Sequence, residues 1–287
     1  MELRTLRYFV AVAEELHFGR AATRLHLSQP PLSRAVQQLE HELGAVLLHR
    51  SPAGVSLTDA GSVLLDEARV LLERADHLRV RVSRAAGARS LTVGMLGDSS
   101  DAGAAGLAAA FRDRHPGVVV TVRETDLSDP TCGLRAGVVD VAVTRGPFDE
   151  TGLEVRLLRR DPVGVVLRAD DPLAGRTDLA LADLDDRTWF RFPDGTDPVW
   201  QRYWGGGQDR DGPVVRVVQE CLQAVLWGGQ VGLAPLGHVP SDQLVVVPLS
   251  DLAPSPVVVA WRAGDLDPVL GSFVEIAADA YRAARTA

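Results

Sequence analysis

The segment from Ser28 to Glu40 carries hydrogen-bonding side chains at the spacing of one helical face. Gln29, Ser33, Arg34 and Gln37 follow one another at spacings of four, one and three, which places them on one side of a helix. Amide, hydroxyl and guanidinium groups of this kind form hydrogen bonds with base edges and phosphates in a DNA groove. The chemistry that this segment offers is therefore recognition of double-stranded DNA.

The other side of the same segment is apolar, with aliphatic residues at spacings of four, three and four. These residues are Leu32, Val36, Leu39 and Leu43. Ser28 is a good N-cap, and the two prolines that follow it fall in the first turn, where a missing N–H costs little. The sequence predicts a helix that buries one side and presents the other to a partner.

Two further predicted helices precede this segment. Residues 18–27 form a short helix with Ala22 and Leu25 facing inward, and a tight turn over 26–28 follows. An earlier amphipathic helix buries Leu3, Leu6, Phe9, Val10 and Ala13. Two helices joined by a short turn make a helix-turn-helix. The alternative is a small helical bundle whose polar face is only solvated, but the order of the elements favours DNA binding.

Residues 1 to about 60 resemble the winged helix-turn-helix of LysR-type transcriptional regulators. The resemblance rests on the run from Met1 to Gly44, on LLHRS at 47–51 and on LTDAG at 57–61, in that order and spacing. The motif QPPLSR at 29–34 is typical of the branch that senses metabolites of aromatic catabolism. The resemblance covers the whole chain, strongly to about residue 85 and more loosely beyond.

The resemblance implies positions for the residues that contact DNA. Those at or near the major groove are Gln29, Pro30, Ser33, Arg34 and Gln37. Arg50, at the start of the wing, is expected to reach phosphate or the minor groove. A second basic residue common in the family's wing is replaced here by Ala53, so weaker wing contacts are expected.

Composition and charge agree with a DNA-binding protein of two or three domains. The chain has 287 residues, of which 46% are hydrophobic and 24% charged, as is ordinary for globular proteins. Residues 1–90 have a formal balance of +2 and residues 91–287 one of −10, so only the first part attracts DNA. No apolar run could span a bilayer, and Arg4, Arg7 and Glu14 interrupt any signal peptide. We expect a cytoplasmic protein without membrane contact.

A long helix is expected from Thr58 or Asp59, either of which can cap it, to about Ala85. A heptad-like seam runs along it through Leu64, Ala68, Leu71, Ala75, Leu78, Val82 and Ala85, with Leu65 and Leu72 widening it. The alternative is packing on its own domain. Because the helix lies between a DNA reader and a later domain, a homodimer coiled coil is favoured, and relatives assemble further into tetramers. Residues 85–90 are expected to form a hinge.

From Leu91 onward, short valine-rich runs alternate with helical stretches, which predicts a doubly wound α/β fold with mostly parallel strands. The runs lie at 91–95, 118–124, 140–144, 163–169, 189–192, 214–218, 231–236, 245–249 and 257–262. A final helix from about Asp267 is expected to return to the first block. Two subdomains joined by two crossover strands resemble the periplasmic-binding-protein clamshell of the family's effector domain.

The fold class expected is thus α/β plus all-α, with three parts along the chain. The winged helix-turn-helix occupies 1–60, and the linker helix with its hinge occupies 58–88. The effector domain occupies 91–287; its first subdomain comprises 91–161 and 264–287, and its second comprises 162–263.

An effector is expected in the cleft between the subdomains, at loops that follow strands. Four loops are candidates: 97–103, 125–130, 192–196 and 228–232. The candidate contacts are Asp98, Ser99, Ser100, Leu127, Ser128, Arg145, Phe192 and Pro193. By resemblance to the aromatic-sensing relatives, the three serines would hold a carboxylate.

Four aspartates crowd the first two loops: Asp98, Asp101, Asp126 and Asp129. One reading is that they cap helices and turns. The other is that they repel anions, so the effector would be cationic or neutral unless Arg145 or Arg191 compensates.

The function expected is sequence-specific transcription regulation, modulated by a small effector. The alternatives are a redox-sensing or ligand-independent regulator of the same fold, and a solute-binding protein. Cys132 and Cys221 match no metal spacing and are expected to be inert thiols. Phosphate loops, zinc motifs and nucleophile elbows are missing from the sequence, so catalysis, a metal site and a cofactor are not expected.

Overall fold

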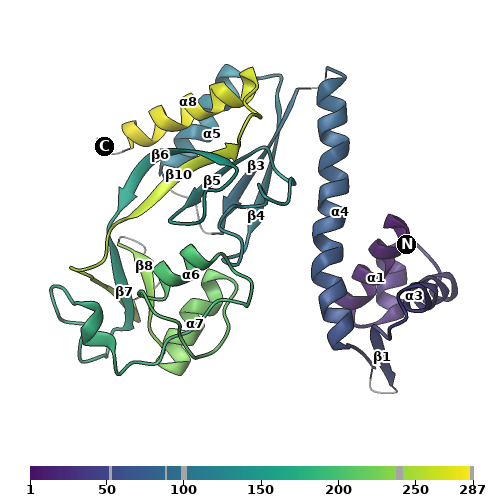
Figure 1. Cartoon of the computed structure of the whole chain (residues 1–287), viewed down its shortest axis with the longest axis horizontal. Helices are drawn as coiled ribbons and strands as arrows, with labels where there is room; N and C mark the ends of the chain where they lie inside the picture. The colour runs from purple at the N-terminus through teal and green to yellow at the C-terminus, as the bar shows by residue number, and fades with distance from the viewer. Residues whose placement is uncertain (52–53, 88, 98–101, 237–241, 285–287) are drawn as a thin grey trace. The chain divides into compact units, whose positions relative to one another are not determined.

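The computed structural model describes residues 1–51, 54–87, 89–97, 102–236 and 242–284 (Figure 1). The chain divides into two compact units, Met1–Ala86 and Gly87–Ala287. Each unit has its own hydrophobic core.

The first unit begins with three helices, α1 (Leu3–Glu15), α2 (Phe18–Arg24) and α3 (Gln29–Leu43). The Nδ1 atom of His17 caps α2 by accepting hydrogen bonds from the backbone N–H groups of Gly19 and Arg20, at 3.0 and 3.2 Å. Ser28 occupies the predicted N-cap position of α3 in extended conformation, but its side chain makes no capping hydrogen bond. The prolines of the first turn need none, because they have no N–H to satisfy.

A two-stranded wing follows the helices, formed by β1 (Leu48–Ser51) and β2 (Gly54–Leu57) in antiparallel register. The long helix α4 (Asp59–Ala85) then begins where the sequence predicts. Thr58 is its cap, since its Oγ1 accepts a hydrogen bond from the N–H of Gly61 at 2.9 Å. Gly61 itself lies against the wing: a Cβ there would stand 2.0 Å from the carbonyl oxygen of Leu47.

The two sides of α4 differ in what they contact. Leu65, Ala68 and Leu72 are buried in the core that α1 and α3 share. The predicted seam is therefore wrong at Ala68 and in part at Leu64, which is half-buried against the same core. Leu65 and Leu72 pack within their own unit instead of widening the seam. A separate set of apolar side chains on α4 is exposed: Val63, Val70, Leu71, Leu78 and Val82.

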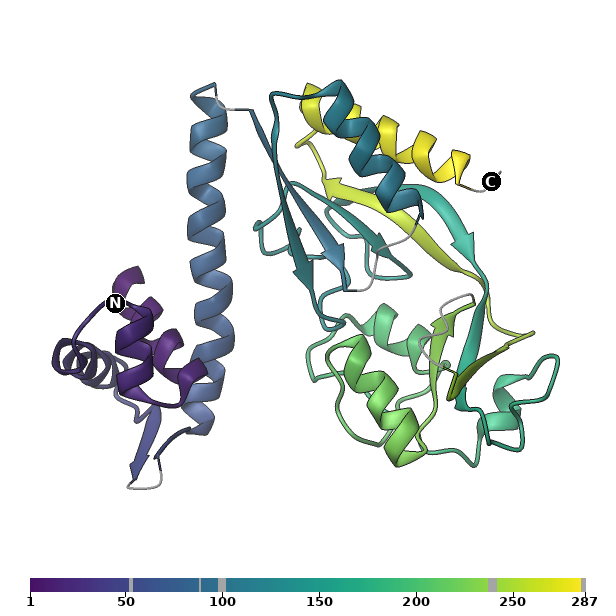
Figure 2. The same cartoon turned by 180° about the vertical axis from the view of Figure 1, so that it is seen from behind.

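The second unit contains a five-stranded mixed sheet in the order β4-β3-β5-β10-β6. Its strands are β3 (Ser90–Leu96), β4 (Val119–Thr125), β5 (Val141–Arg145), β6 (Leu153–Asp161) and β10 (Ser255–Arg262). Strand β3 pairs in parallel with β4 and β5, whereas β10 runs antiparallel to β5 and β6. Figure 2 shows α5 (Ala102–Arg114) and α8 (Pro268–Ala283) side by side along this sheet, as predicted for the final helix.

A second, three-stranded sheet has the order β8-β7-β9, with β7 (Val163–Arg168) in the centre. Its neighbours β8 (Gly232–Pro235) and β9 (Leu244–Pro248) both run antiparallel to it, so the expectation of mostly parallel strands is wrong here. Around it lie a 3-10 helix (Leu181–Leu184), α6 (Pro198–Trp204) and α7 (Val218–Gly228).

Two of the predicted strands are not strands. The runs at 189–192 and 214–218 are extended but pair only through isolated bridges, Trp189 with Val231 and Arg191 with Val214. Val218 is already the first residue of α7. Trp189, Phe190, Phe192 and Val215 are buried, whereas Val214 and Val217 are exposed, so burial of these runs does not require a sheet.

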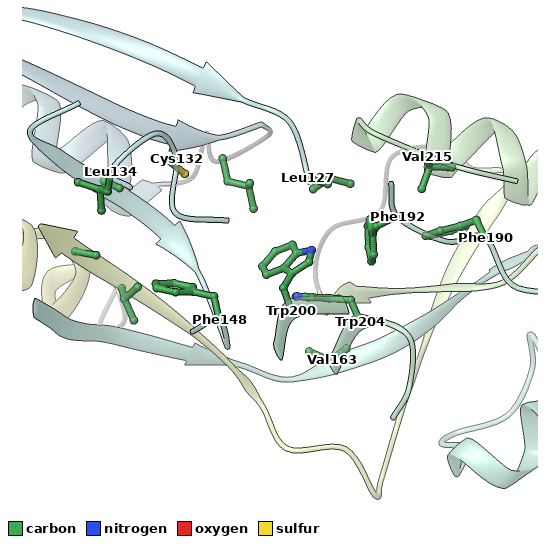
Figure 3. Packing of buried hydrophobic residues seen from close by; sticks show 14 of the residues in the cluster. Leu127, Cys132, Leu134, Phe148, Val163, Phe190, Phe192, Trp200, Trp204 and Val215 are labelled. Atoms are coloured by element: carbon green, nitrogen blue, oxygen red, sulfur yellow. The ribbon is translucent and has the colours of Figure 1, made fainter. Parts of the chain in front are cut away.

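Two connections join the sheets, as predicted. One residue, Pro162, separates β6 from β7, and residues 249–254 separate β9 from β10. Because β10 pairs with β5 and β6, it belongs to the first sheet, and the second subdomain ends before Ser255 instead of at 263. One apolar cluster bridges the two sheets and includes Val163, Val258, Trp200 and Trp204 (Figure 3).

Candidate nucleic-acid interface and effector site

The two sides of α3 separate as the sequence predicts. Leu32, Val36 and Leu39 are fully buried, at 0% exposure each. The side chains opposite them are exposed at Gln29, Pro30, Arg34 and Gln37, and Ser33 is half-buried. Leu43 is the exception in the predicted apolar stripe, because it is the last residue of the helix and is 43% exposed.

Arg34 is the best placed of these residues to contact a nucleic acid. It is exposed on α3 and forms no ion pair with any residue in the part of the chain that the structure describes. Its guanidinium offers several donors in a planar fork, which matches both a guanine edge and a phosphate. The side chain can therefore bind a partner without first breaking an internal contact.

Arg50 is held within the protein, by contrast. Its Nη1 donates to the Oγ of Ser33 at 3.0 Å, and its Nη2 lies 3.5 Å from the Oε2 of Glu40. The guanidinium also stands over the ring of Phe18, 4.5 Å from the centroid. The side chain is 34% exposed, so it joins the wing to α2 and α3 while leaving one edge at the surface.

Glu40 completes the same junction from α3. Its Oε1 accepts hydrogen bonds from the backbone N–H groups of Leu47 and Leu48, at 2.9 and 3.2 Å. Hydrogen bonds from backbone N–H groups to a charged carboxylate are stronger than those between neutral groups. The start of the wing is thus fixed to the C-terminal half of α3.

A cavity of about 320 Å³ lies between the two sheets of the second unit. Its wall includes the end of β3, parts of β5, β6, β7 and β8, and faces of α6 and α7. This is the cleft position predicted for an effector, and its volume is at the small end of the range for ligand pockets.

Aromatic and aliphatic side chains form most of the wall. The aromatic residues are Phe190, Phe192, Trp200, Trp204 and Tyr281. Trp200 contacts Trp204 and Phe192, with ring centroids 5.3 and 6.4 Å apart, so the rings hold one another in place. The cavity is thus suited to a flat or branched apolar body.

The charged groups on the wall are two arginines and one aspartate. Asp161 accepts hydrogen bonds from Arg145 at 2.8 Å and from Arg159 at 2.8 and 3.1 Å. All three side chains are largely buried, and their formal charges leave an excess of +1. Burial raises the pKa of neighbouring Tyr203 to about 12, and the charge of Arg145 opposes that rise.

The sequence-predicted contacts divide into three groups. Leu127, Arg145 and Phe192 line the cavity, together with Gly97 at the start of the first loop. Ser128 and Pro193 are not among the residues that line it. Asp98, Ser99, Ser100 and Asp101 lie outside the described residues, as does Ala53 of the wing.

The aspartates of the second loop are occupied by turns. Asp126 Oδ1 accepts from the N–H of Ser128 at 2.9 Å and also from its hydroxyl. Asp129 accepts from Thr131 and from the N–H of Gly133, at 2.6 to 3.0 Å. These carboxylates shape the loop, which is the first of the two readings that the sequence left open.

Four wall residues were not predicted from sequence: Arg159, Asp161 and the two tryptophans of α6. A signal for β6 was present, because residues 153–157 alternate apolar and charged side chains as an amphipathic strand does. For Trp200 and Trp204 the spacing of four predicts one helical face, but nothing in the sequence says what that face covers.

Comparison with known proteins decides the family. The LysR substrate binding domain matches residues 84–282, and the LysR-family bacterial regulatory helix-turn-helix matches residues 3–62. This chain belongs to the LysR family of transcriptional regulators. It is a DNA-binding regulator with a C-terminal effector-binding domain.

Relatives of this LysR-family chain span most of its length. The Hca operon transcriptional activator HcaR of Escherichia coli is 32% identical, over 96% of this chain and 97% of HcaR. The regulator BenM of Acinetobacter baylyi is 31% identical, over 91% and 90%. The crystal structure of CbnR in complex with its target DNA has a TM-score of 0.61 at 27% identity and covers 98% of this chain.

The two thiols of this LysR-family chain differ in exposure, since Cys132 is buried and Cys221 is half-buried. Burial raises the pKa of Cys132 and of Cys221 to about 12. Cys132 is fully buried, whereas Cys221 lies on the wall of the cavity. Neutral thiols are poor nucleophiles, so both residues are expected to react slowly with alkylating reagents.

The described residues contain neither a membrane-spanning helix nor a cluster of metal ligands. None of the helices there is both long and apolar enough to cross a membrane. Within the same ranges, no three His, Cys, Asp or Glu side chains gather closely enough to hold a metal ion.

Proposed function

We propose that this regulator reads its operator through the exposed side of α3, works as a homodimer joined through α4, and responds to a small anionic effector in the cavity. The observation that carries the first part is the division of α3, with three fully buried aliphatic residues on one side and exposed hydrogen-bonding groups on the other. Such a helix is anchored by its core and free to enter a major groove.

The DNA-binding residues proposed are Gln29, Pro30, Ser33, Arg34 and Gln37, with Arg50 supporting them. Arg34→Ala tests the assignment in a binding assay with the DNA upstream of the protein's own gene. The expected loss is about 1–3 kcal/mol if Arg34 contacts a guanine in bidentate fashion, and less if it contacts only phosphate.

Arg282→Ala is the matched control for that assay. Arg282 is also an exposed arginine, but it lies on α8 in the second unit and pairs with Asp279 at 2.9 Å. Its loss should leave DNA affinity unchanged. Equal effects of the two substitutions, or no effect of Arg34→Ala, would exclude α3 as the recognition helix.

The effector is proposed to be a small apolar molecule with one anionic group. The aromatic wall suits the apolar body, and the excess positive charge of Arg145 and Arg159 over Asp161 favours an anion. Asp126 and Asp129, which suggested a cation or neutral compound at the level of sequence, are engaged in their own loop. Arg145 thus supplies the compensating charge.

A pair of probes with one shape and opposite charge tests this proposal. The anion 4-isopropylbenzoate should bind and raise the melting temperature, whereas the cation 4-isopropylbenzylammonium should not. Arg145→Gln should weaken binding of the anion. Tight binding of the cation alone would contradict the proposal.

The dimer is proposed from the exposed apolar side chains of α4, which would be covered by a second copy of the helix. A dimer places two copies of α3 on successive turns of an operator. Further assembly into a tetramer, and action in the cytoplasm where DNA is accessible, belong to the same proposal.

A further inference from the structure

The wing is too small to hold its own orientation. Its two strands, β1 and β2, have four residues each and pair only with each other in the part of the chain that the structure describes. An isolated pair of short strands is marginally stable in water. The direction in which the wing points therefore depends on the contacts that its residues make with the helices.

Two such contacts join the wing to α3, and they lie at different points on both elements. Glu40 accepts hydrogen bonds from the N–H groups of Leu47 and Leu48, at the start of the wing. The hydroxyl of Ser33 accepts a hydrogen bond from Arg50, further along β1, at 3.0 Å. Ser33 and Glu40 lie two turns of helix apart on α3, which is about 10 Å along its axis.

Two separated contacts fix an angle, whereas a single contact leaves a pivot. With Glu40 alone, the wing is attached at its base and can rotate relative to α3. The hydrogen bond between Arg50 and Ser33 removes that freedom, because it attaches β1 to the N-terminal half of α3, which also carries Arg34. The wing and the exposed side of α3 are then held in one arrangement before DNA is present, which lowers the entropic cost of binding.

The guanidinium of Arg50 is suited to this role by its shape. Its Nη1 donates to Ser33, and its Nη2 lies 3.5 Å from the carboxylate of Glu40. The group also stands over the ring of Phe18, at the start of α2. A planar fork can make these contacts together, whereas an ammonium group is a single point of charge. Arg50→Lys would therefore keep the charge but could not keep all three contacts.

We propose that Arg50 and Ser33 form a positioning pair, which sets the angle between the wing and α3 and affects DNA binding through that angle. In this role Arg50 does not act as a phosphate contact, in contrast to what the family resemblance implies. The inference rests on the proposed reading of DNA by α3. It divides the residues named there into those that contact the duplex, such as Arg34, and two that orient the wing.

Two substitutions of Arg50 separate charge from shape in DNA binding by the full chain. Arg50→Gln removes the charge, whereas Arg50→Lys keeps it. Because lysine also binds phosphate, Arg50→Lys would bind nearly as tightly as the unsubstituted protein if Arg50 contacted phosphate. For a positioning residue, both substitutions should weaken binding to the DNA upstream of the protein's own gene by a similar factor, roughly 10-fold.

The salt dependence of binding gives a second criterion, which a loss of stability alone does not change. Each phosphate contact adds about 0.9 to the slope of log affinity against log salt concentration. Arg50 is the only Arg or Lys between residues 48 and 57, so a change in the wing angle removes no other arginine or lysine from the DNA. We expect an unchanged slope in Arg50→Gln, whereas loss of a phosphate contact would reduce it by about 0.9 per protomer.

The two residues should also behave as one unit. Ser33→Ala should weaken binding, and Arg50→Gln should have little further effect in that background, because the contact is already absent. Arg7→Gln is the matched control. Arg7 has a similar exposure of 37%, but it joins α1 to α4 through Asp76, at 2.8 Å. Its substitution should leave DNA affinity unchanged.

Amide hydrogen exchange measures the attachment of the wing without DNA. Residues 48–57 should exchange roughly 3- to 10-fold faster in Ser33→Ala than in the unsubstituted protein, although Ser33 lies outside the wing. Equal exchange rates, affinity retained in either Arg50 variant, a reduced salt slope, or additive effects of Ser33→Ala and Arg50→Gln would overturn the inference while sustaining α3 as the recognition helix. If Arg34→Ala has no effect on binding, the proposed function itself fails and the inference fails with it.

Discussion

Replacement of Glu40 tests whether one carboxylate holds the wing to the recognition helix. In Glu40→Ala, the N–H groups of Leu47 and Leu48 lose their acceptor, and Arg50 loses its ion-pair partner. Hydrogen bonds to a charged group contribute about 1.5–3 kcal/mol each. The Glu40 side chain is 17% exposed, so water can replace some of the lost hydrogen bonds. We therefore expect Glu40→Ala to lower the local free energy of unfolding by about 3 kcal/mol.

Glu40→Gln separates the two contributions. The amide oxygen can still accept from the backbone N–H groups, whereas the charge opposite Arg50 is gone. Because that pair is 3.5 Å apart and partly exposed, its loss contributes well under 1 kcal/mol. We expect a cost of about 1 kcal/mol for Glu40→Gln, mainly from the weaker hydrogen bonds.

Native-state hydrogen exchange of the full chain is the suitable assay, because unfolding of a chain with two units is not a single transition. A loss of about 3 kcal/mol corresponds to roughly 100-fold faster exchange over residues 44–58. Glu42→Ala is the matched control: its carboxylate is 40% exposed and contacts the N-terminal ammonium at 3.0 Å. If exchange is no faster in Glu40→Ala than in the control, Glu40 does not hold the wing to α3.

Three other substitutions or measurements follow from the structure. Leu71→Arg places a charge among the exposed apolar residues of α4 and should convert the dimer to monomer in sedimentation, whereas Asp66→Arg, an exposed polar position on the same helix, should not. Gly61→Ala puts a methyl group 2.0 Å from the carbonyl oxygen of Leu47 and should cost about 1–3 kcal/mol, whereas Gly117→Ala meets nothing within 4 Å and should be neutral by comparison. Because folding raises the pKa of both thiols from 9.0 to about 12, iodoacetamide at pH 8 should react roughly 1000-fold more slowly with the native than with the unfolded protein. The same shift should lower the free energy of unfolding as the pH rises above about 9; fast native alkylation or stability unaffected by pH there would contradict the burial of the thiols.

The N-terminal unit could be predicted from sequence because its signals are local. The spacing of Leu32, Val36 and Leu39 defines the buried side of α3, and Thr58 caps α4 where the sequence places it. The seam of α4 could not be assigned in the same way. By its spacing, Ala68 could face either a second copy of α4 or the core of its own unit. Only the packing of α1 shows that it is buried within its own unit.

The effector cavity depends on contacts between residues far apart in the chain. Leu127, Arg145 and Phe192 were identified because they follow or end extended runs, where ligands commonly bind. Arg159, Asp161 and Tyr281 could not be, since their proximity arises from the pairing of β10 with β6 and from the packing of α8 on β6. The second sheet was misjudged because antiparallel central strands, when buried, have the same valine-rich composition as parallel ones.

Pro162 is the whole of one connection between the two lobes that enclose the cavity. The ring of a proline fixes its φ angle, so at this point the backbone can rotate only about the ψ bond of Pro162 and the torsions of its neighbours. The two subdomains are therefore held close together at this edge. The second connection, residues 249–254, is longer and has more torsional freedom. A ligand that draws the two subdomains together should rotate them about an axis near Pro162. Lengthening this one-residue connection should therefore weaken the coupling between ligand binding in the cavity and conformational change in the rest of the protein.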